Sequence, residues 1–584
     1  MYQSNYDLIN RKFKEFFLPT ILMSMSTNIS MVVDSLIVSF LIGAINISAI
    51  QAIAPVLTFI NLLYWMVGFG GSLISSTAKS SHEEERGNIY FTVAFITLII
   101  MGIIFALLCI VNLDYLSHLL CRTPNLVPLV KRFFSAYIIG IPFIFVIMGL
   151  SYFIRVDGKP NMAFYALLLT NIVNLCLDFI FLGVFNMDVF GAGLATSIGF
   201  IVGTLYLLKY FFDKDRTMKI VKLSKYKIKT IFTYLKDIVV LGFSSSSTQL
   251  FLTINLLVFN TVISTLMGSS GFVAFGICRN LLFILYMFLI GTAQSMSPIV
   301  SIYYNEENYD KVDHIVKRSL KIVLFSSLVM SLIFIIYPQL ALKMYSVKAG
   351  IDFNIVINAV RLYAISYVGT AITFIMMFYM QAIKRKTLSL LISLFEGLIV
   401  PILAIYPLIN LFGPEAIWLS FAIAELVTIL IILISVKIIE KRSNGEYRGL
   451  LLLKNDNIEE KYEYSLNADK NEIINFTRDI SDKFKGKFDD STVNHLSLSI
   501  EEMLIYIIEN NEGLKTIDLI VNINDKNIVL VITDEGKDFN PTIVDDVEEF
   551  SNIDFLNKIA DKIEYARVIG LNNTTITVNR WFII

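Results

Sequence analysis

The feature that most constrains the fold of this chain is a series of long apolar segments, which follow one another from Lys14 to Ile439. Each segment is roughly 20 residues long or longer, the length at which an α-helix crosses a hydrocarbon core about 30 Å thick. Charged residues make up only 17% of the whole chain, and they become denser after Glu440. We therefore expect one large helical membrane domain followed by one small soluble domain.

The apolar segments predict twelve transmembrane helices. They lie near residues 15–41, 47–77, 88–112, 131–154, 162–184, 190–212, 236–265, 271–300, 315–337, 356–383, 388–411 and 415–439. Lys and Arg gather in the N-terminal segment, the even-numbered loops and the connection 213–235, whereas the opposite loops hold few. Because basic connections stay on the cytoplasmic side, we expect a multi-pass protein of the plasma (inner) membrane with both termini in the cytoplasm. The basic connection is interpreted as a topology determinant on an anionic leaflet, with a substrate-binding strip as the alternative.

The two halves of the helical part resemble each other. One shift places Gly68 on Gly291, and a nearly equal shift places Phe190-Gly191 on Phe412-Gly413. Each half then holds six helices, and an even number gives both halves the same orientation, as in transporters built from parallel repeats. The predicted fold class is an all-α polytopic membrane protein with twelve transmembrane helices in two six-helix lobes (parallel internal repeat), plus a C-terminal cytoplasmic α+β sandwich domain. The expected divisions are 1–212 for the N-terminal lobe, 213–235 for the basic linker, 236–440 for the C-terminal lobe, 441–460 for a second linker and 461–584 for the soluble domain.

Two stripes of polar residues interrupt the apolar helices of the first half. The first stripe is Asn171, Asn174 and Asp178, and the second, with the same spacing, is Thr27, Ser30 and Asp34. This spacing puts each set on one helix face, and an acid at bilayer depth costs about 2.5–3.5 kcal/mol on insertion scales. If the faces meet, two carboxyl groups share a cavity, where one can hold a proton near neutral pH or both can bind a sodium ion with the amide oxygens. We expect ion coupling here, with H+ or Na+ left open. The alternative is a hydrogen-bonded clamp between helices.

The second half is poorer in acids. Its seventh span carries an uncharged polar face, formed by Ser246, Gln249, Thr253 and Asn260. Glu396 aligns with Asn174 and is either a second acid of the transport path or the partner of a basic group, whereas Glu415 and Glu425 are expected to be structural. The segments Phe374–Met380 and Tyr286–Phe288 offer bulky apolar side chains that suit an amphipathic ligand, with packing or lipid contact as the alternative.

Several segments between residues 10 and 440 resemble the multidrug and toxic compound extrusion (MATE) transporters. They are Pro19–Gly43 with its Val-Val-Asp34-Ser, Arg155-Val-Asp157-Gly158-Lys-Pro160, Asn174-x-x-x-Asp178, Gly191-Ala-Gly-Leu-Ala-Thr196 and Gly291-Thr-Ala-Gln-Ser-Met-Ser-Pro298. The resemblance implies two lobes in a V, efflux of organic and often cationic compounds driven by proton or sodium entry, and a coupling site at Asp34, Asn174 and Asp178. Acids that another branch of the family carries in spans seven and ten are missing here. The wider superfamily includes flippases for lipid-linked sugars, so a lipid flippase is an alternative.

The soluble tail reads as an α+β layer. Strands are predicted at Lys461–Leu466, Thr516–Val521, Asn527–Thr533, Ile563–Val568 and Thr574–Val578, and helices at Lys470–Lys485, Ser491–Asn510 and near Asp554–Asp561. Ser499-Ile-Glu501-Glu502 and Asp534-x-Gly536 resemble the histidine-kinase-type ATPase fold of anti-sigma-factor serine kinases. That resemblance implies that Asp534 and Gly536 contact adenine, that Thr575 assists, and that Glu502 is the acid that places Mg²⁺.

The tail departs from this pattern at two places. Tyr506 stands where the family has an Asn, and the segment Glu548–Phe555, expected to be rich in glycine, has none. Backbone amides approach phosphates closely through glycine, so we expect a degenerate, non-catalytic domain, with ATP and Mg²⁺ binding as the alternative. A membrane-tethered serine kinase or sensor is the corresponding alternative for the whole chain.

These observations predict a secondary active antiporter for multidrug efflux and xenobiotic transport rather than an enzyme. The expected partners are a small organic substrate, the lipid bilayer and a cytoplasmic regulatory protein. The net charge of −1 gives no indication of a nucleic-acid partner. Neither a metal site nor a resident cofactor is predicted beyond the coupling ion, since the four cysteines have no metal-binding spacing.

Overall fold

The structure is a computed structural model. It describes residues 6–80, 84–157, 159–213, 216, 218–305, 307–347, 351–454, 460–511, 514–523, 527–537, 560–568 and 571–579, and within these ranges it leaves the side chains of 26–31 and a few others undescribed. Thr27 and Ser30 of the predicted polar stripe therefore have side chains outside the described set.

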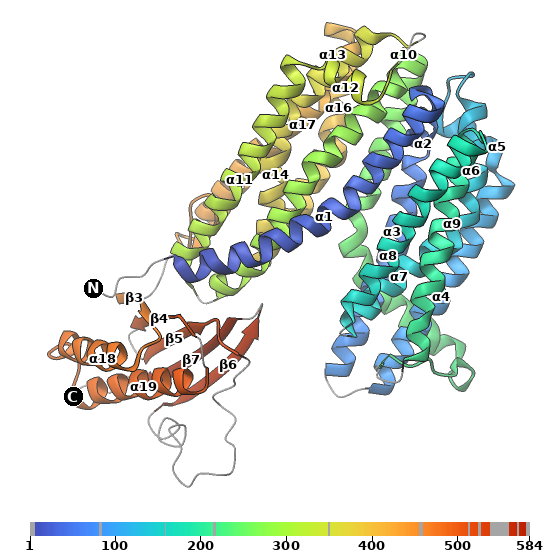
Figure 1. Cartoon of the computed structure of the whole chain (residues 1–584). Coiled ribbons are helices and arrows are strands. Elements are labelled where there is room, and N and C mark those ends of the chain that lie inside the picture. The colour runs from blue at the N-terminus through green and yellow to red at the C-terminus, as the bar shows by residue number, and fades with distance from the viewer. Residues whose placement is uncertain are drawn as a thin grey trace.

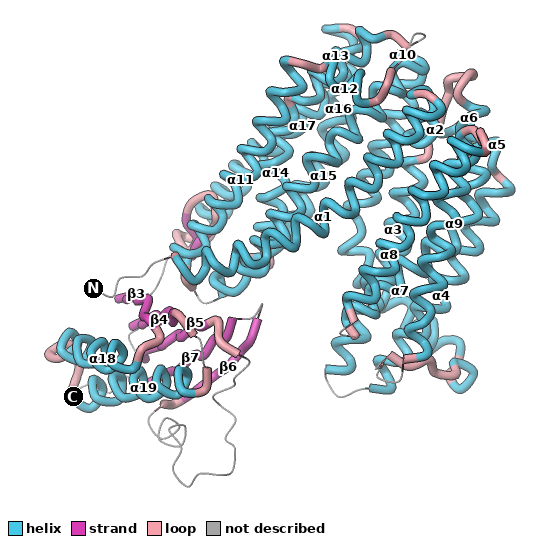
Figure 2. Tube along the Cα trace, viewed as in Figure 1, coloured by secondary structure: helices cyan, strands magenta, loops and turns pink. Residues whose placement is uncertain are grey.

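Helices dominate up to residue 442 (Figures 1 and 2). The first half contains α1 (Asp7–Ile42), α2 (Ile47–Ala52), α3 (Ala54–Ser80), α4 (Glu84–Val111), α5 (Leu113–Leu120), α6 (Val127–Tyr137), α7 (Ile141–Val156), α8 (Pro160–Asp178) and α9 (Val189–Leu207). The second half contains α10 (Ile228–Asn305), α11 (Tyr309–Ile336), α12 (Gln339–Met344), α13 (Phe353–Ala364), α14 (Ser366–Ala382), α15 (Lys386–Leu394), α16 (Val400–Phe412) and α17 (Leu419–Arg442). Short helical turns join them: η1 (Ala44–Asn46), η2 (Ile138–Gly140), η3 (Phe179–Val184), η4 (Leu208–Phe212), η5 (Leu223–Lys225), η6 (Phe395–Ile399) and η7 (Pro414–Trp418).

Ten helical segments of the described chain are long and apolar enough to cross a membrane. One of them, the 59-residue segment Ser246–Tyr304, consists of two helices joined at Gly268, whose backbone has φ 56° and ψ −140°. A side chain with a Cβ is strained at such a positive φ, so glycine is suited to this reversal. Gly43, which ends α1 with φ 98°, has the corresponding place in the first half.

Each half has its own buried core, and the two halves exchange the first part of their first helices. Ile9 and Phe13 of α1 belong to the core of the second half, whereas Ile238 of α10 belongs to the core of the first half. At the second crossing a Cβ added to Gly242 would lie 1.8 Å from the carbonyl oxygen of Met66, so the two backbones touch. Below, the N-terminal lobe is the part that packs around the first core, and the C-terminal lobe is the part that packs around the second.

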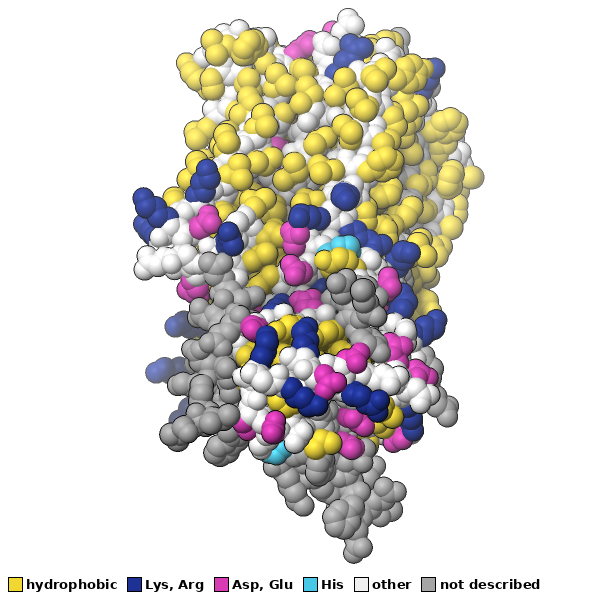
Figure 3. All heavy atoms as spheres, turned by 90° about the vertical axis from the view of Figure 1, so that its left-hand side faces the viewer, with side chains coloured by type: hydrophobic (Ala, Val, Ile, Leu, Met, Phe, Trp, Pro, Cys, Tyr) yellow, Lys and Arg dark blue, Asp and Glu magenta, His cyan; other side chains and the backbone are white. Residues whose placement is uncertain are grey.

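The two lobes meet at the end that holds the Gly268 reversal and diverge toward the end at which the tail lies (Figure 1). Hydrogen bonds link the lobes near the joined end: Thr253 donates to Thr58 (2.9 Å), Asn260 donates to the carbonyl of Ala52 (3.1 Å), and the amide of Arg122 donates to Ser264 (2.8 Å). Hydrophobic side chains cover the upper part of the face in Figure 3, whereas charged ones gather lower down and on the tail. This pattern is the one expected of helices that face lipid.

The tail folds as one antiparallel sheet with two helices on one face (Figures 1 and 2). The strands are β3 (Glu460–Asn467), β4 (Thr516–Ile523), β5 (Asn527–Asp534), β6 (Lys562–Val568) and β7 (Leu571–Asn579), in the order β3-β4-β5-β7-β6. The helices α18 (Lys470–Phe484) and α19 (Asp490–Glu509) bury their apolar sides against the sheet. These elements confirm the predicted strands and the first two predicted helices, whereas the helix predicted near Asp554–Asp561 falls almost wholly outside the described residues.

The segment between α17 and the tail, expected to be a charged linker, contains a small hairpin of β1 (Tyr447–Arg448) and β2 (Leu453–Lys454). The hydroxyl of Tyr379 donates to the carbonyl of Leu451 (2.6 Å), and that of Tyr304 donates to the carbonyl of Leu452 (3.0 Å). The guanidinium of Arg385 also lies 4.4 Å from the ring centre of Tyr447. The hairpin is thus attached to the C-terminal lobe.

Candidate functional site

The two predicted acids of the first half lie together inside the protein. Asp178 is the last residue of α8, immediately before the π-helical turn η3, and it is fully buried. Asp34 lies on α1, which packs against α8 and η3. The carboxyl groups of Asp34 and Asp178 are within hydrogen-bonding reach of each other. π-Helical turns inside α-helices are frequent at functional sites.

Two neutral residues orient the pair. The side-chain amide of Asn174 donates to Asp178 Oδ2 (3.1 Å) and to Thr196 Oγ1 on α9 (3.3 Å). The Oδ1 atoms of Asp34 and Asp178 are buried and have no hydrogen-bond partner within the described part of the chain. Two adjacent carboxyl groups bond to each other only when one of them holds a proton, and a small cation between them is the other way to offset their repulsion. The arrangement can therefore take up and release one positive charge.

The structure thus brings Asp34, Asn174 and Asp178 together, and their role in ion coupling stays a prediction. Asn171 is half-buried one turn before Asn174, and no side-chain hydrogen bond of Asn171 is found among the residues described. Thr196 is a further member that sequence reasoning missed. It lies in a glycine- and alanine-rich segment, and nothing in that pattern distinguishes its hydroxyl from one that merely bonds its own helix, as Thr196 also does through the carbonyl of Ala192 (2.9 Å).

A second pair of acids lies within the C-terminal lobe. Glu425 on α17 accepts hydrogen bonds from Thr370 and Thr373 on α14, both at 2.7 Å. Glu396, in the π-helical turn η6, also reaches Thr373 and faces Glu425. No ion pair of Glu396 with a basic group is found where the chain is described, and its role as a second acid of the transport path stays a prediction. Glu415 has a local structural contact, since it accepts from the amide of Asn358 (2.6 Å).

The remaining polar and apolar candidates of the second half are occupied by packing. Thr253 and Asn260 bond the N-terminal lobe, as described above. In the segment Phe374–Met380 the side chains of Met376, Tyr379 and Met380 are buried in the core of the C-terminal lobe. The ring of Phe374 contacts Tyr286 at a centroid distance of 5.6 Å. Packing rather than a free ligand surface therefore describes most of this segment.

In the tail, the Asp534–Gly536 loop is held by internal contacts. The carboxylate of Asp534 is buried and accepts from the amide of Gly536 (2.7 Å) and from Asn572 Nδ2 (2.8 Å). A Cβ added to Gly536 would lie 2.5 Å from the side-chain oxygen of Asn511, so a larger residue there requires that side chain to shift. Thr575 sits on β7 opposite Val531 of β5.

The acid expected to place Mg²⁺, Glu502, lies on α19. Partial burial, then the neighbouring Glu501 and Glu509, raises the pKa of the Glu502 carboxyl above its ordinary value. Glu502 offers a carboxylate, but Tyr506 offers a phenol where the family has the amide oxygen of an Asn, and a phenol is a poor ligand for Mg²⁺. In the described residues no group of three His, Cys, Asp or Glu side chains could hold a metal ion. The segment Glu548–Phe555 lies outside the described residues, and a degenerate, non-catalytic tail stays a prediction.

Comparison with known proteins points in one direction. A family model described as MatE matches residues 19–180 and 245–407. The multidrug export protein MepA of Staphylococcus saprophyticus is 22% identical over 437 residues, which cover 75% of this chain and 95% of that protein. MepA of Staphylococcus aureus is 21% identical and covers 70% of this chain and 89% of its own.

Solved structures show the same fold. An inward-facing MATE transporter of the MOP superfamily superposes with a TM-score of 0.64, is 20% identical, and covers 71% of this chain and 95% of that one. An outward-facing MATE transporter gives a TM-score of 0.56 at 21% identity, covering 72% of this chain and 93% of that one. The family model ends before the tail, so these likenesses concern the helical part.

Proposed function

This chain belongs to the MatE family of membrane transporters, and on that premise we propose that it is a secondary active antiporter that exports organic, cationic or amphipathic compounds in exchange for H+ or Na+. The observation that carries the proposal is the contact between Asp34 and Asp178. Two carboxyl groups that compete for one positive charge away from water provide a site whose occupancy follows the ion gradient. The names of the relatives support multidrug export as the class of transport.

The position of the pair suggests how ion binding is coupled to movement. Asp34 lies on α1, whose first turns pack in the core of the C-terminal lobe, whereas Asp178 belongs to the N-terminal lobe. Binding of an ion draws the two carboxyl groups together, and its release lets them repel each other. We propose that this change alters how α1 lies between the lobes. Asn174 and Thr196 hold Asp178 in place during that change.

We further propose twelve membrane crossings with both termini in the cytoplasm of a plasma-membrane protein. Adding α1 to the ten apolar segments, and counting the two helices joined at Gly268 separately, gives this number. The basic residues of the connection 213–235 support the orientation. We propose the divisions expected from the sequence, except that α10 already begins at Ile228 within the expected linker 213–235 and the second linker contains the hairpin of β1 and β2. The tail is proposed to be a non-catalytic regulatory domain, because Tyr506 replaces the amide ligand of Mg²⁺ and the segment Glu548–Phe555 has no glycine.

The coupling proposal is tested by efflux of a fluorescent organic cation from vesicles under an imposed pH or sodium gradient. We expect Asp178→Asn to abolish gradient-driven efflux while the protein stays folded, because an amide cannot release a proton or hold a cation as a carboxylate does. The gradient that drives efflux in the parent protein identifies the ion. The matched control is Asp114→Asn, the same chemical change at an exposed acid that pairs with Lys131. Undiminished efflux in Asp178→Asn would contradict the assignment.

A further inference from the structure

The first turns of α1 are fixed to the C-terminal lobe by direct contacts. The ring of Tyr6 stacks on His314 of α11 with centroids 3.9 Å apart. Asn10 Oδ1 is hydrogen-bonded by His314 and Arg318, and the guanidinium of Arg318 lies 4.9 Å from the ring centre of Phe13. This end of α1 therefore moves with α11 as long as these contacts persist.

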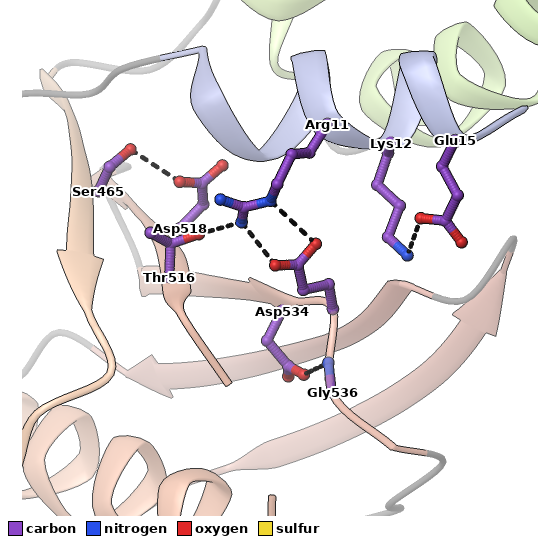
Figure 4. A network of polar contacts seen from close by, with 9 residues as sticks. Arg11, Lys12, Glu15, Ser465, Thr516, Asp518, Asp534 and Gly536 are labelled. Atoms are coloured by element: carbon purple, nitrogen blue, oxygen red, sulfur yellow. Dashed lines mark hydrogen bonds and ion pairs between the residues drawn. The ribbon is translucent and has the colours of Figure 1, made fainter. Parts of the chain in front are cut away.

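The tail binds the same turns of α1 through Arg11 (Figure 4). Arg11 donates from Nη2 to Glu535 Oε1 (2.6 Å) and from Nε to Glu535 Oε2 (3.3 Å). The same Nη2 also donates to Thr516 Oγ1 (2.7 Å). Paired donation from a guanidinium to a carboxylate fixes orientation as well as distance. Glu535 is the middle residue of the Asp534–Gly536 loop, so the internal contacts of that loop hold the acid that binds α1.

The tail also binds the C-terminal lobe through β4, the strand that carries Thr516. Asp518 pairs with Lys311 at the start of α11, and both side chains are 2% exposed. Ser465 of β3 donates to Asp518 Oδ1 (2.7 Å). Because side chains two residues apart share one face of a strand, Thr516 and Asp518 lie on the same face of β4, where they contact Arg11 of α1 and Lys311 of α11. We call Arg11, Lys311, Thr516, Asp518 and Glu535 the latch residues.

We propose that the tail is a latch that joins the end of α1 to the C-terminal lobe and so favours the arrangement in which the lobes diverge on the tail's side. This proposal rests on the proposed function in one respect: α1 is taken to carry the coupling residue Asp34. Any movement of α1 away from α11 must separate Arg11 from Glu535. The buried Lys311–Asp518 pair resists displacement of the tail itself, because parting its members would leave charges out of water without a partner.

The test measures the arrangement of the lobes directly, by double electron–electron resonance on the full-length protein. Cys109, Cys121, Cys176 and Cys278 are replaced by Ala. One pair of spin labels is placed at the exposed residues Ser224 and Lys317, which lie on the two lobes at the tail's end, and a second pair at Lys317 and Asn494 reports docking of the tail. Neither readout depends on a transported substrate.

We expect Arg11→Glu to lengthen the Lys317–Asn494 distances and to shift the Ser224–Lys317 distribution toward shorter values. The reversed pair, Arg11→Glu with Glu535→Arg, should restore both distributions. The matched control is Lys14→Glu, the same charge change at an exposed position one turn along α1, which should change neither. Undocking of the tail without any change between the lobes would overturn the proposal.

A tail that stays docked in Arg11→Glu is examined with the additional substitution Lys311→Glu. If the tail still stays docked, the latch residues do not hold it, and the proposal is again overturned. The outcome is separable from the coupling proposal, because Asp178→Asn should abolish efflux without releasing the tail. A latch without ion coupling, or coupling without a latch, would each be recognised.

Discussion

Two pairs of acids lie inside the helical part of this protein, one in each lobe, and they differ in what holds them. Both adjoin a π-helical turn, η3 beside Asp178 and η6 around Glu396. The pair of the N-terminal lobe joins α1 to α8, and α1 is a helix shared between the two cores. The pair of the C-terminal lobe joins elements that all belong to that lobe. The same chemical groups are thus placed once on a helix shared between the two lobes and once within a single lobe.

The acid pair of the C-terminal lobe is also the more completely hydrogen-bonded of the two. Glu425 accepts from two threonine hydroxyls at 2.7 Å, whereas Asp178 accepts from the amide of Asn174 at 3.1 Å, and one oxygen of each aspartate is without a partner in the described structure. Well-satisfied buried polar groups stabilise a fold, and incompletely satisfied ones are sites where an ion or a change of state is expected. The location and the hydrogen bonds of an acid within the membrane therefore indicate its role better than its mere presence in an apolar helix does.

The two acid pairs are expected to differ most in how much gradient-driven efflux depends on them. Asp34→Asn should abolish gradient-driven efflux from vesicles, because it removes one member of the pair that spans the junction. Glu425→Gln should leave most of the efflux, because the amide keeps an acceptor oxygen for Thr370 or Thr373 within the same lobe. Equal loss in both variants would show that the two pairs act together and that coupling is not confined to the N-terminal lobe.

A smaller effect is expected on the free energy of unfolding, and here the acid pair of the C-terminal lobe should matter more than that of the N-terminal lobe. Thr373→Val removes a hydroxyl that bonds Glu425 and reaches Glu396, and leaving a buried acceptor without its partner costs about 1–3 kcal/mol. Thr196→Val removes a weaker contact to the neutral amide of Asn174, for which about 0.5–1.5 kcal/mol is expected. Thermal unfolding of the purified protein in one detergent compares the two. A larger loss for Thr196→Val would reverse the view that the C-terminal pair is the more structural one.

The smallest effect concerns an acid outside the membrane, which serves as a reference for both pairs. The pKa of Glu502 is raised by partial burial and by Glu501 and Glu509. An acid whose pKa is higher in the folded than in the unfolded protein adds to the free energy of unfolding at pH values below its unfolded pKa. This addition is lost as the pH rises through the folded pKa. Glu502→Gln should therefore stabilise the tail at neutral pH, by less than about 1 kcal/mol because the side chain is partly solvated, and this gain should vanish at pH 4. Urea unfolding of the tail, followed by the pH dependence of its midpoint, measures it.

The sequence predicted one pair of acids and not the other for a physical reason. Asn174 and Asp178 are four residues apart on one helix, so helical periodicity alone places them together, and the matching stripe on the first helix indicated Asp34. Glu396 and Glu425 lie on different helices, and their meeting at Thr373 depends on how α14, α17 and η6 pack. No local period reports such a contact. The same limit applies to Thr196, whose partner Asn174 lies on another helix. It applies even more to the latch residues, whose partners on α1 and α11 are hundreds of positions away in the chain.

In the tail, most elements could be predicted because they depend on local patterns in the sequence. Its strands and its first two helices follow from alternation and amphipathic spacing, and those elements lie where they were predicted. The hairpin at Tyr447–Lys454 was missed because it is short and lies inside a segment that is charged as a whole, and two of its carbonyls accept hydrogen bonds from Tyr304 and Tyr379, which are distant in the sequence.

That hairpin has a consequence for kinetics. By fastening the start of the tail to Tyr304 and Tyr379, it restricts the volume that an undocked tail can explore, so the face of β4 that carries Thr516 and Asp518 stays near α1 and α11 at a high effective concentration. Redocking is then an intramolecular event whose rate does not depend on how many copies of the protein the membrane holds. A signal that opens the latch has to compete with this rapid return, and its effect lasts only while the signal remains bound.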